Sequence, residues 1–382
     1  MPVNDPAYES NKNNSTYITC AGHSCYRAFA IYKIQNKHIE DKKDLEGFID
    51  KQAVKYIADS NAYGLVIGIY KNGKVLIKGY GTTGNGKNEA PDSSTTFELA
   101  STSKLFTTST LQLLVDKGEL NMDDKIQTLL GDKVQLPAIA RHTTLQNLAT
   151  HLSGFPSLPE SFLAKMTDES DPYKDLTIAD MYDYLKTCEG KKAEGTFEYS
   201  NFGMGLLGHL LELKTGIAYE QLVKQRLLNE LGMYNTFVTV DSNTHTNIIQ
   251  GYDENGKPSP IWTDHVLTGA GSFLSNGDDM IRFIKANLRE NETPISPSLF
   301  KTHIRQLNGE NGLGWILPTA VDKLVGNKDV IWHNGMAGAY ASFLAIDKTN
   351  NSGIIILSNK AIDVTGLGMK LMVMTRTQSW KE

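Results

Sequence analysis

The sequence predicts an α/β fold of the α+β type: an antiparallel sheet built from both ends of the chain, with flanking helices and an inserted all-helical lobe. Two observations predict it. β-Rich runs lie near the beginning and near the end of the 382 residues, and the long stretch between them has the apolar spacing of helices. A sheet with helices on its faces is the simplest arrangement that buries all of these elements.

The first predicted elements are a helix and a hairpin. Apolar residues recur at helical spacing over residues 45–57, and two β-rich runs follow at residues 64–70 and 75–80. Asn72-Gly73 stands between these runs, and this dipeptide favours a tight hairpin turn. We therefore expect the chain to enter the sheet through two paired strands.

The middle of the chain is predicted to be helical. A helix is expected over about residues 101–118, and residues 120–265 are expected to be mostly helical. Two helices within this stretch are predicted at about residues 203–214 and 219–231, and Gly232 is placed to end the second.

Strands return near the end of the chain. Residues 330–333, 340–346 and 353–357 are β-rich, and a turn-rich connection at residues 347–352 separates the last two runs. The chain is predicted to finish with a helix over about residues 364–380.

These elements predict the domain organisation. Residues 1–40 form a polar leader and a docking segment, and residues 41–119 together with 266–382 form a discontinuous lobe that contains the sheet. Residues 120–265 form the helical lobe. Ser101 is then expected between the two lobes, where ligand clefts commonly form.

The composition excludes several classes of partner. A net charge of -5 and a pI of about 6.0 give no reason to expect a nucleic acid or another polyanion. No apolar run reaches the length of a membrane span. The first residues are polar, so the expected location is periplasmic or secreted if an export signal was removed, and cytoplasmic otherwise. The pairs Lys42-Lys43 and Lys191-Lys192 are expected to be solvated.

The cysteines and the nucleotide motifs point to no cofactor. Cys20 and Cys25 are close enough to pair in an oxidising compartment, and Cys188 stands alone. No Cys/His spacing is typical of a zinc site, so no metal is expected. A nucleophile elbow, a Walker loop and a dinucleotide fingerprint are all missing from the sequence.

Three short motifs predict an acyl-transfer site: Ser101-Thr-Ser-Lys104, Tyr199-Ser-Asn201 and His333-Asn-Gly335. Lys104 follows Ser101 by about one helical turn, so both side chains would share one helix face. A serine hydroxyl is a weak nucleophile unless a neighbouring group takes its proton. A lysine or a tyrosine can take it if local charges lower its pKa.

The Ser-x-x-Lys motif is weak alone, since Ser298-Leu-Phe-Lys301 matches it too. The order and spacing of the three motifs, however, resemble the penicillin-recognition serine hydrolases: class C β-lactamases and their carboxypeptidase and esterase relatives. The resemblance runs from about residue 45 to about residue 362. Further matching segments are Phe97–Phe106, Leu148–Pro156, Gly195–Asn201, Leu231–Met233, Gly269–Ser272 and Leu357–Asn359.

The resemblance implies roles for the first two motifs and a β-lactamase-like fold. Ser101 would be the nucleophile, and Tyr199 the general base that later protonates the leaving group. Asn201 would orient Lys104 and bind the acyl-side amide of the substrate. Lys104 as a neutral amine could also accept the serine proton, so the residues leave open which of Lys104 and Tyr199 is the base. His151 is another landmark of the resemblance, and we expect it to be structural.

The third motif departs from the class C pattern. His333 stands where those enzymes carry the lysine of Lys-Thr-Gly, and Asn334 replaces the threonine. Histidine here resembles the carboxypeptidase, D-amino-acid amidase and esterase branches. Gly335 would allow the strand to approach the substrate closely. The resemblance also implies an oxyanion hole made by the backbone N–H groups of Ser101 and Met336.

The sequence therefore predicts a serine hydrolase that works through an acyl-enzyme on a D-amino-acid peptide, in the manner of a D-Ala-D-Ala carboxypeptidase, or on a small ester. A class C-type β-lactamase is the first alternative, weakened by His333 and Asn334. A binding protein that keeps the fold without turnover is the second. The expected partner is a small-molecule or peptide substrate, with specificity carried by loops such as 157–171 and 255–265.

Overall fold

The structure is a computed structural model that describes residues 44–84, 89–263, 266–289, 291–306, 311–319, 322 and 328–380. These residues belong to one unit of the chain, Glu40–Glu382. The leader and docking segment, Cys20, Cys25 and Lys42-Lys43 lie outside the described residues.

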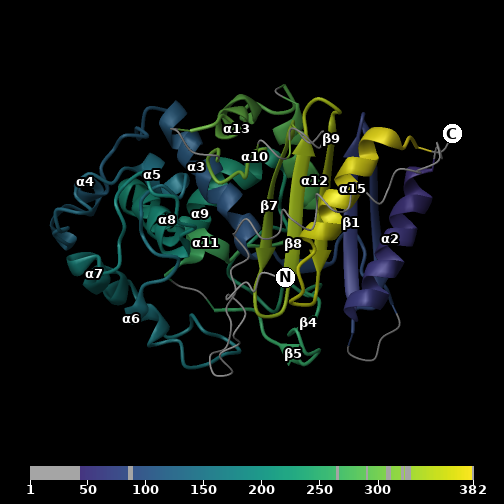
Figure 1. Ribbon diagram of the computed structural model, residues 1–382, viewed down its shortest axis with the longest axis horizontal. Helices are drawn as coiled ribbons and strands as arrows, with labels where there is room; N and C mark the ends of the chain where they lie inside the picture. The colour runs from purple at the N-terminus through teal and green to yellow at the C-terminus, as the bar shows by residue number, and fades with distance from the viewer. Residues whose placement is uncertain are drawn as a thin grey trace, which may run out of the picture. The chain divides into compact units, whose positions relative to one another are not determined.

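The centre of the fold is a five-stranded sheet in the order β2-β1-β9-β8-β7, in which all neighbours are antiparallel (Figure 1). The strands are β1 (Gly64–Lys71), β2 (Lys74–Gly81), β7 (Val330–Met336), β8 (Ala341–Asp347) and β9 (Ser352–Ser358). Because β1 pairs with β9, the two ends of the chain meet inside one sheet. The predicted architecture is confirmed.

The hairpin between β1 and β2 turns at the predicted dipeptide. Lys71 pairs with Lys74, and the two residues between them have φ values of 50° (Asn72) and 88° (Gly73). Two successive residues with positive φ are what a two-residue hairpin loop requires, and Asn-Gly adopts this conformation readily.

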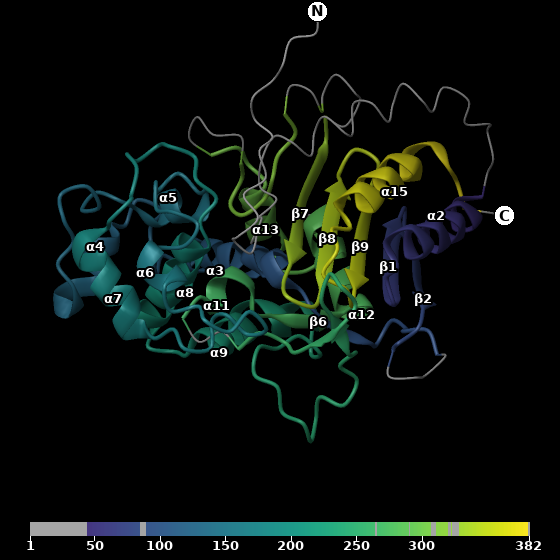
Figure 2. The ribbon, with the colours of Figure 1, turned by 60° about the horizontal axis from the view of Figure 1, so that its bottom comes forward.

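Helices cover both faces of the sheet. α2 (Leu45–Ser60) and α15 (Thr365–Thr377) lie together on one face, and α12 (Gly277–Leu288) covers the other (Figure 2). Packing is close on both sides. A Cβ on Gly68 of β1 would lie 3.3 Å from Ile281 of α12, and a Cβ on Gly368 of α15 would lie 2.1 Å from Phe343 of β8.

Shorter elements complete the sheet side of the molecule. They are β3 (Thr96–Glu98), which pairs with β6 (Leu274–Asn276), the 3-10 turn η1 (Ala100–Ser103), α11 (Thr268–Gly271) and α13 (Ser296–Thr302).

The middle of the chain supplies the helical region and its own apolar core (Figure 1). Its helical elements are α3 (Lys104–Asp116), α4 (Ile126–Leu130), η2 (Gly131–Lys133), α5 (Leu145–Ala149), α6 (Glu160–Leu163), α7 (Ile178–Thr187), α8 (Asn201–Thr215), α9 (Tyr219–Val223), the π-helical turn η3 (Lys224–Leu228) and α10 (Asn229–Leu231). Both helices predicted here are present, and Gly232 ends the second with φ 69°.

The helical prediction extends too far toward the C-terminus. From Gly232 to Thr263, all of which the structure describes, the chain forms no helix and contains the short strands β4 (Gly251–Tyr252) and β5 (Pro258–Ser259). This segment is rich in Asn, Asp, Thr, Gly and Pro, whose side chains or ring compete with the helical backbone.

One surface prediction is wrong. Lys191 is only 6% exposed, its Nζ donates to the carbonyl of Lys192 at 3.2 Å, and it lies 5.3 Å from the centre of the Phe155 ring. Burial lowers the pKa of this lysine. Lys192 is exposed, as predicted. A lysine can bury its aliphatic stem when its ammonium finds a carbonyl and an aromatic face.

Among the helices that the structure describes, none is long and apolar enough to cross a membrane. Within the same residues, no three His, Cys, Asp or Glu side chains gather as a metal site would require.

Candidate active site

Ser101 lies in a rigid turn that enters α3. Ala100, the residue before it, has φ 48°, a left-handed conformation that costs alanine about 1–2 kcal/mol. The turn is held from both sides: Leu99 donates its N–H to the Phe273 carbonyl at 2.8 Å, and the Ser342 hydroxyl donates to the Leu99 carbonyl at 2.6 Å. Ser101 therefore sits in the 3-10 turn η1, just ahead of the helix rather than within it.

Lys104 links the first two motifs. Its side chain is fully buried, and its Nζ lies 2.9 Å from Ser101 Oγ, 2.8 Å from Asn201 Oδ1 and 2.6 Å from the Ala270 carbonyl oxygen. The structure thus brings Ser101, Lys104 and Asn201 together as the sequence predicts. The Ala270 carbonyl is a contact that the sequence pattern does not reveal.

These three oxygens fit both protonation states of Lys104. An ammonium has three N–H donors and can donate to all three oxygens. A neutral amine has two N–H donors for the Asn201 and Ala270 oxygens, and its lone pair then accepts the Ser101 hydroxyl proton. The arrangement is therefore suited to proton exchange between Ser101 and Lys104 without movement of heavy atoms.

Tyr199 completes the group. Its hydroxyl is hydrogen-bonded to the Ser101 side chain, and its ring centre lies 4.9 Å from Lys104 Nζ. Burial raises the pKa of the Tyr199 phenol, and the bond with Ser101 only partly opposes that shift. The lowered pKa that Tyr199 would need to take the Ser101 proton is therefore not present in the free protein, where its side chain is a neutral phenol.

The second Ser-x-x-Lys match has a different environment. Lys301 is exposed and its Nζ pairs with Asp116 at 2.7 Å, and the Ser298 side chain is hydrogen-bonded to the same carboxylate. Lys301 is solvated and paired with a carboxylate, so the Ser298 and Lys301 pair has neither the burial nor the partners found at Ser101 and Lys104.

His333 faces the same site from β7. It is 1% exposed, and its ring centre lies 6.2 Å from that of Tyr199. Nδ1 donates to the Asn334 carbonyl at 2.6 Å, which leaves Nε2 as an acceptor. Burial and the nearby charge of Lys104 lower the pKa of His333 to about 3. The imidazole is therefore uncharged at neutral pH and offers no positive charge to a substrate carboxylate.

The other two residues of the third motif point in different directions. Side chains alternate along a strand, so Asn334 faces away from His333 and Gly335. Its amide nitrogen donates to Thr365 Oγ1 at 3.0 Å, at the start of α15. Gly335 lies directly against the Ser101 turn, since an added Cβ would lie 2.2 Å from the Leu99 carbonyl oxygen and 2.9 Å from Ser101 N.

Gly335→Ala should therefore damage the site. Two of the close atoms belong to the backbone, so β7 or the Ser101 turn must shift. A misplacement of about 1 Å can cost about 10²-fold in rate, and overpacking costs about 1–3 kcal/mol in stability. We expect a loss of kcat by one to two orders of magnitude and a lower Tm. Gly366→Ala is the matched control, because its Cβ would meet no atom within 4 Å. Equal kcat in the two variants would contradict this role for Gly335.

The edge of β7 offers a backbone donor beside Ser101. Trp332 exchanges backbone hydrogen bonds of 2.9 and 3.1 Å with Ile316, on the side of β7 away from β8. N–H groups of alternate residues along a strand point the same way, so the Met336 N–H points to that outer edge as well. Ala337, one residue later, donates instead to Tyr340 on the β8 side at 3.0 Å. The Met336 and Ser101 N–H groups are thus both candidates for an oxyanion hole.

Comparison with known proteins decides the family. A family model described as "Beta-lactamase" matches residues 49–369. The chain belongs to the beta-lactamase family of serine hydrolases.

Relatives within the beta-lactamase family carry more than one activity in their names. The chain is 27% identical over 353 residues to a "Beta-lactamase" of Pseudomonas fluorescens, covering 83% of this chain and 94% of the relative. It is 24% identical over 331 residues to the "D-alanyl-D-alanine-carboxypeptidase/endopeptidase AmpH" of Escherichia coli (strain K12), covering 82% and 83%. The solved "Beta-Lactamase/D-Alanine Carboxypeptidase from Pseudomonas syringae" shares the fold, with a TM-score of 0.72, 24% identity and coverage of 87% and 98%.

The two loops expected to carry specificity in this family member meet each other. Thr263 donates its N–H to Asp171 Oδ1 at 2.8 Å, and the Trp262 ring packs edge-on to Tyr173 with centres 5.1 Å apart. Trp262 also covers the β7–β8 turn, where a Cβ on Gly338 would lie 2.4 Å from its Nε1. This aromatic pair therefore lies close to the strand end that carries Met336.

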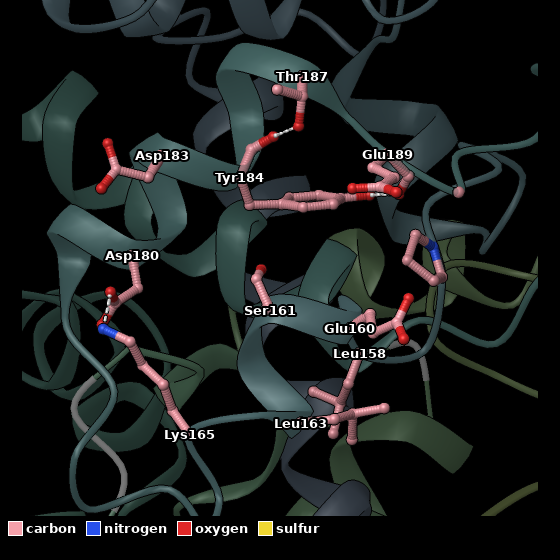
Figure 3. Close-up of a pocket in the computed structure, with 12 residues that line it drawn as sticks. Leu158, Glu160, Ser161, Leu163, Lys165, Asp180, Asp183, Tyr184, Thr187 and Glu189 are labelled. Atoms are coloured by element: carbon pink, nitrogen blue, oxygen red, sulfur yellow. Dashed lines mark hydrogen bonds and ion pairs between the residues drawn. The ribbon is translucent and has the colours of Figure 1, made fainter.

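A groove of about 650 Å³ lies along the first of these loops, between α6 and α7 (Figure 3). The Tyr184 ring lines it, and so does Pro156, whose carbonyl accepts a hydrogen bond from the Ser200 hydroxyl at 2.7 Å. It contains none of the predicted catalytic side chains. The lining residues are Pro156, Leu158, Glu160, Ser161, Leu163, Lys165, Asp180, Asp183, Tyr184, Thr187, Glu189 and Gly190.

Proposed function

We propose that the protein is a serine hydrolase that works through an acyl-enzyme on a small ester or a D-amino-acid peptide. The observation that carries the proposal is the position of Lys104 Nζ, buried and within hydrogen-bond distance of both Ser101 Oγ and Asn201 Oδ1. A serine whose hydroxyl contacts a buried amine has the partner that nucleophilic attack requires.

In acylation, Lys104 as a neutral amine takes the Ser101 proton while Oγ attacks the substrate carbonyl. The N–H groups of Ser101 and Met336 stabilise the oxyanion. Tyr199, a neutral phenol in the free protein, donates its proton to the leaving group as the bond to the carbonyl carbon breaks. The acyl-enzyme then holds a Lys104 ammonium beside a Tyr199 phenolate.

Deacylation uses the same two groups in reverse. The Tyr199 phenolate takes a proton from water, whose oxygen attacks the acyl carbon. Lys104 returns its proton to Ser101 Oγ as the acyl group leaves as an acid. Protons balance over the cycle, and the phenolate exists only while the adjacent ammonium stabilises it. Asn201 holds Lys104 in place and is free on its amide nitrogen side to bind the acyl-side amide.

The uncharged His333 favours substrates without a carboxylate at that position. Nε2 of the neutral ring accepts a hydrogen bond and provides no positive charge. A β-lactam places a ring carboxylate beside this part of the site in the class C enzymes that the sequence resembles. An ester with a neutral leaving group requires only the nucleophile and the oxyanion hole.

Wild-type protein should hydrolyse an activated short-chain ester readily and nitrocefin slowly. We expect the ratio of kcat/KM values, p-nitrophenyl ester over nitrocefin, to exceed tenfold, and a D-Ala-D-Ala peptide to lie between them. His333→Lys should shift this ratio toward nitrocefin, because lysine restores a permanent cation. If nitrocefin leads by tenfold or more in the wild type, the neutral His333 does not disfavour β-lactams.

That outcome would favour the second candidate, a class C-type β-lactamase. The relative from Pseudomonas fluorescens is named "Beta-lactamase", and its similarity spans most of both chains. The other alternative, a binding protein without turnover, predicts that a fluorophosphonate probe leaves Ser101 unlabelled.

A further inference from the structure

His151 makes three contacts with three successive residues of one segment. Its carbonyl accepts the Glu198 N–H at 2.9 Å, and its Nδ1 accepts the Ser200 N–H at 3.1 Å. Its ring packs on the ring of Tyr199, the residue between them, with centres 4.6 Å apart and planes 32° apart. His151 is thus hydrogen-bonded to the backbone on both sides of Tyr199 and packs on the Tyr199 ring.

The conformation and protonation of His151 suit this role. Its φ is 60°, a left-handed value that histidine adopts several-fold more often than most side chains. Because Ser200 donates to Nδ1, the ring is neutral and carries its proton on Nε2. Burial, and after it the charge of the nearby Lys104, holds the pKa of His151 well below its usual value. The hydrogen bond from Ser200 thus uses Nδ1 as an acceptor of a neutral ring.

Ser200, which donates its N–H to His151, makes further hydrogen bonds that connect it to the rest of the site. The Ser200 hydroxyl donates to the Pro156 carbonyl at 2.7 Å and accepts the Gly203 N–H at 2.8 Å, which caps α8. The first residue of α8 is Asn201, whose Oδ1 accepts from Lys104. Fixing Ser200 therefore fixes the residues on both sides of it against Lys104.

We propose that His151 is a positioning residue for the hydrolytic reaction: it sets the Tyr199 ring beside Lys104 and Ser101 and holds the start of α8 in register with them. The inference rests on the proposed function for its kinetic test. It goes beyond the structural role expected of His151, because its effect on rate acts through Tyr199 and through the start of α8.

A double-mutant cycle tests the proposal. His151→Leu removes the Nδ1 acceptor and should lower kcat on the ester by about 10- to 100-fold with KM changed less than threefold, since misplacement of a reacting group costs rate rather than binding. His151→Asn keeps a short acceptor and tolerates positive φ, so it should recover at least half of that loss on a logarithmic scale. In a Tyr199→Phe background, His151→Leu should cost clearly less than it does in the wild type, because the part of its effect that acts through the Tyr199 hydroxyl is already lost.

His303→Leu is the matched control. His303 is also buried, and its pKa is also held well below its usual value, but it contacts Asn287 at 2.9 Å and none of the site residues. Both leucine variants should lower Tm, and only His151→Leu should lower kcat. Equal kcat losses in the two variants, or a full His151→Leu loss in the Tyr199→Phe background, would overturn the proposal.

A second readout does not depend on turnover. In protein labelled with ¹³C-tyrosine, the resonance missing from Tyr199→Phe belongs to Tyr199. It should move in His151→Leu, move back toward wild type in His151→Asn and stay in place in His303→Leu. If the Tyr199 resonance does not move in His151→Leu, the positioning role is wrong. If it moves but the wild-type protein shows no turnover, only the proposed function is wrong.

Discussion

Ser101→Ala should abolish turnover while the fold remains intact. Loss of the nucleophile from a serine protease lowers kcat on the order of 10⁶-fold, and we expect a loss of that size on the ester. The side chain is partly exposed at the surface of the turn, and the change deletes one oxygen, so Tm should move by only a few degrees. Steady-state assays and thermal unfolding of the same preparation measure both effects.

Ser298→Ala is the control for that experiment. It removes the serine of the second Ser-x-x-Lys match, whose lysine is paired with Asp116. Activity should stay within twofold of wild type. Residual activity above 1% in Ser101→Ala, or a comparable loss in Ser298→Ala, would show that the nucleophile is assigned to the wrong serine.

Tyr199→Phe should have the second-largest effect. The change keeps the ring and deletes the proton that reaches the leaving group and the base that activates water. General acid–base groups contribute about 10²–10⁴-fold, so kcat should fall within that range. A p-nitrophenolate leaves without protonation, so acylation should survive better than deacylation. The variant should therefore show a burst of p-nitrophenolate followed by slow turnover.

Stopped-flow kinetics separate these two steps. An alkyl ester, whose leaving group needs a proton, should show no burst in Tyr199→Phe because acylation is slow as well. A drop of less than tenfold on both esters would mean that Tyr199 is a packing residue and that Lys104 alone moves the protons.

The architecture of the sheet could be predicted because its strands carry dense local signals. β1, β8 and β9 are continuous apolar runs, and the hairpin at Asn72-Gly73 is encoded by two adjacent residues. The group of Ser101, Lys104, Tyr199 and Asn201 could be predicted because the spacing and order of two motifs resemble a known family. Contacts between residues about 97 positions apart in the chain are otherwise invisible to local patterns.

Other features depend on packing that a single sequence does not display. In the sequence, the three residues of His333-Asn-Gly335 look like neighbours in one site. Because side chains alternate along a strand, Asn334 instead points to Thr365 of α15. The neutral state of His333 follows from its burial beside Lys104, not from its position in the motif. Ala100 carries no signal of its left-handed backbone, since sequence rules reserve that conformation for glycine and asparagine.

The end of the predicted helical lobe also depends on contacts that a local sequence pattern does not contain. The sequence predicts that residues 120–265 are mostly helical, although Asn, Thr, Gly and Pro are frequent in the non-helical segment from residue 232 to residue 263. Their real partners are distant: Phe237 exchanges backbone hydrogen bonds with Leu274, and Ile249 donates to the Thr96 carbonyl. Such pairings are set by the closure of the fold around the sheet, which no local window contains.

The most direct test of the central claim is to locate the covalent intermediate. Wild-type protein is treated with a fluorophosphonate probe and, separately, mixed with the ester and quenched in acid, and the adduct is mapped by mass spectrometry of the digested chain. We expect one adduct in each case, on Ser101, absent from Ser101→Ala and unaffected by Ser298→Ala. An adduct on any other residue, or hydrolysis of the ester without any acyl-enzyme on Ser101, would contradict this expectation.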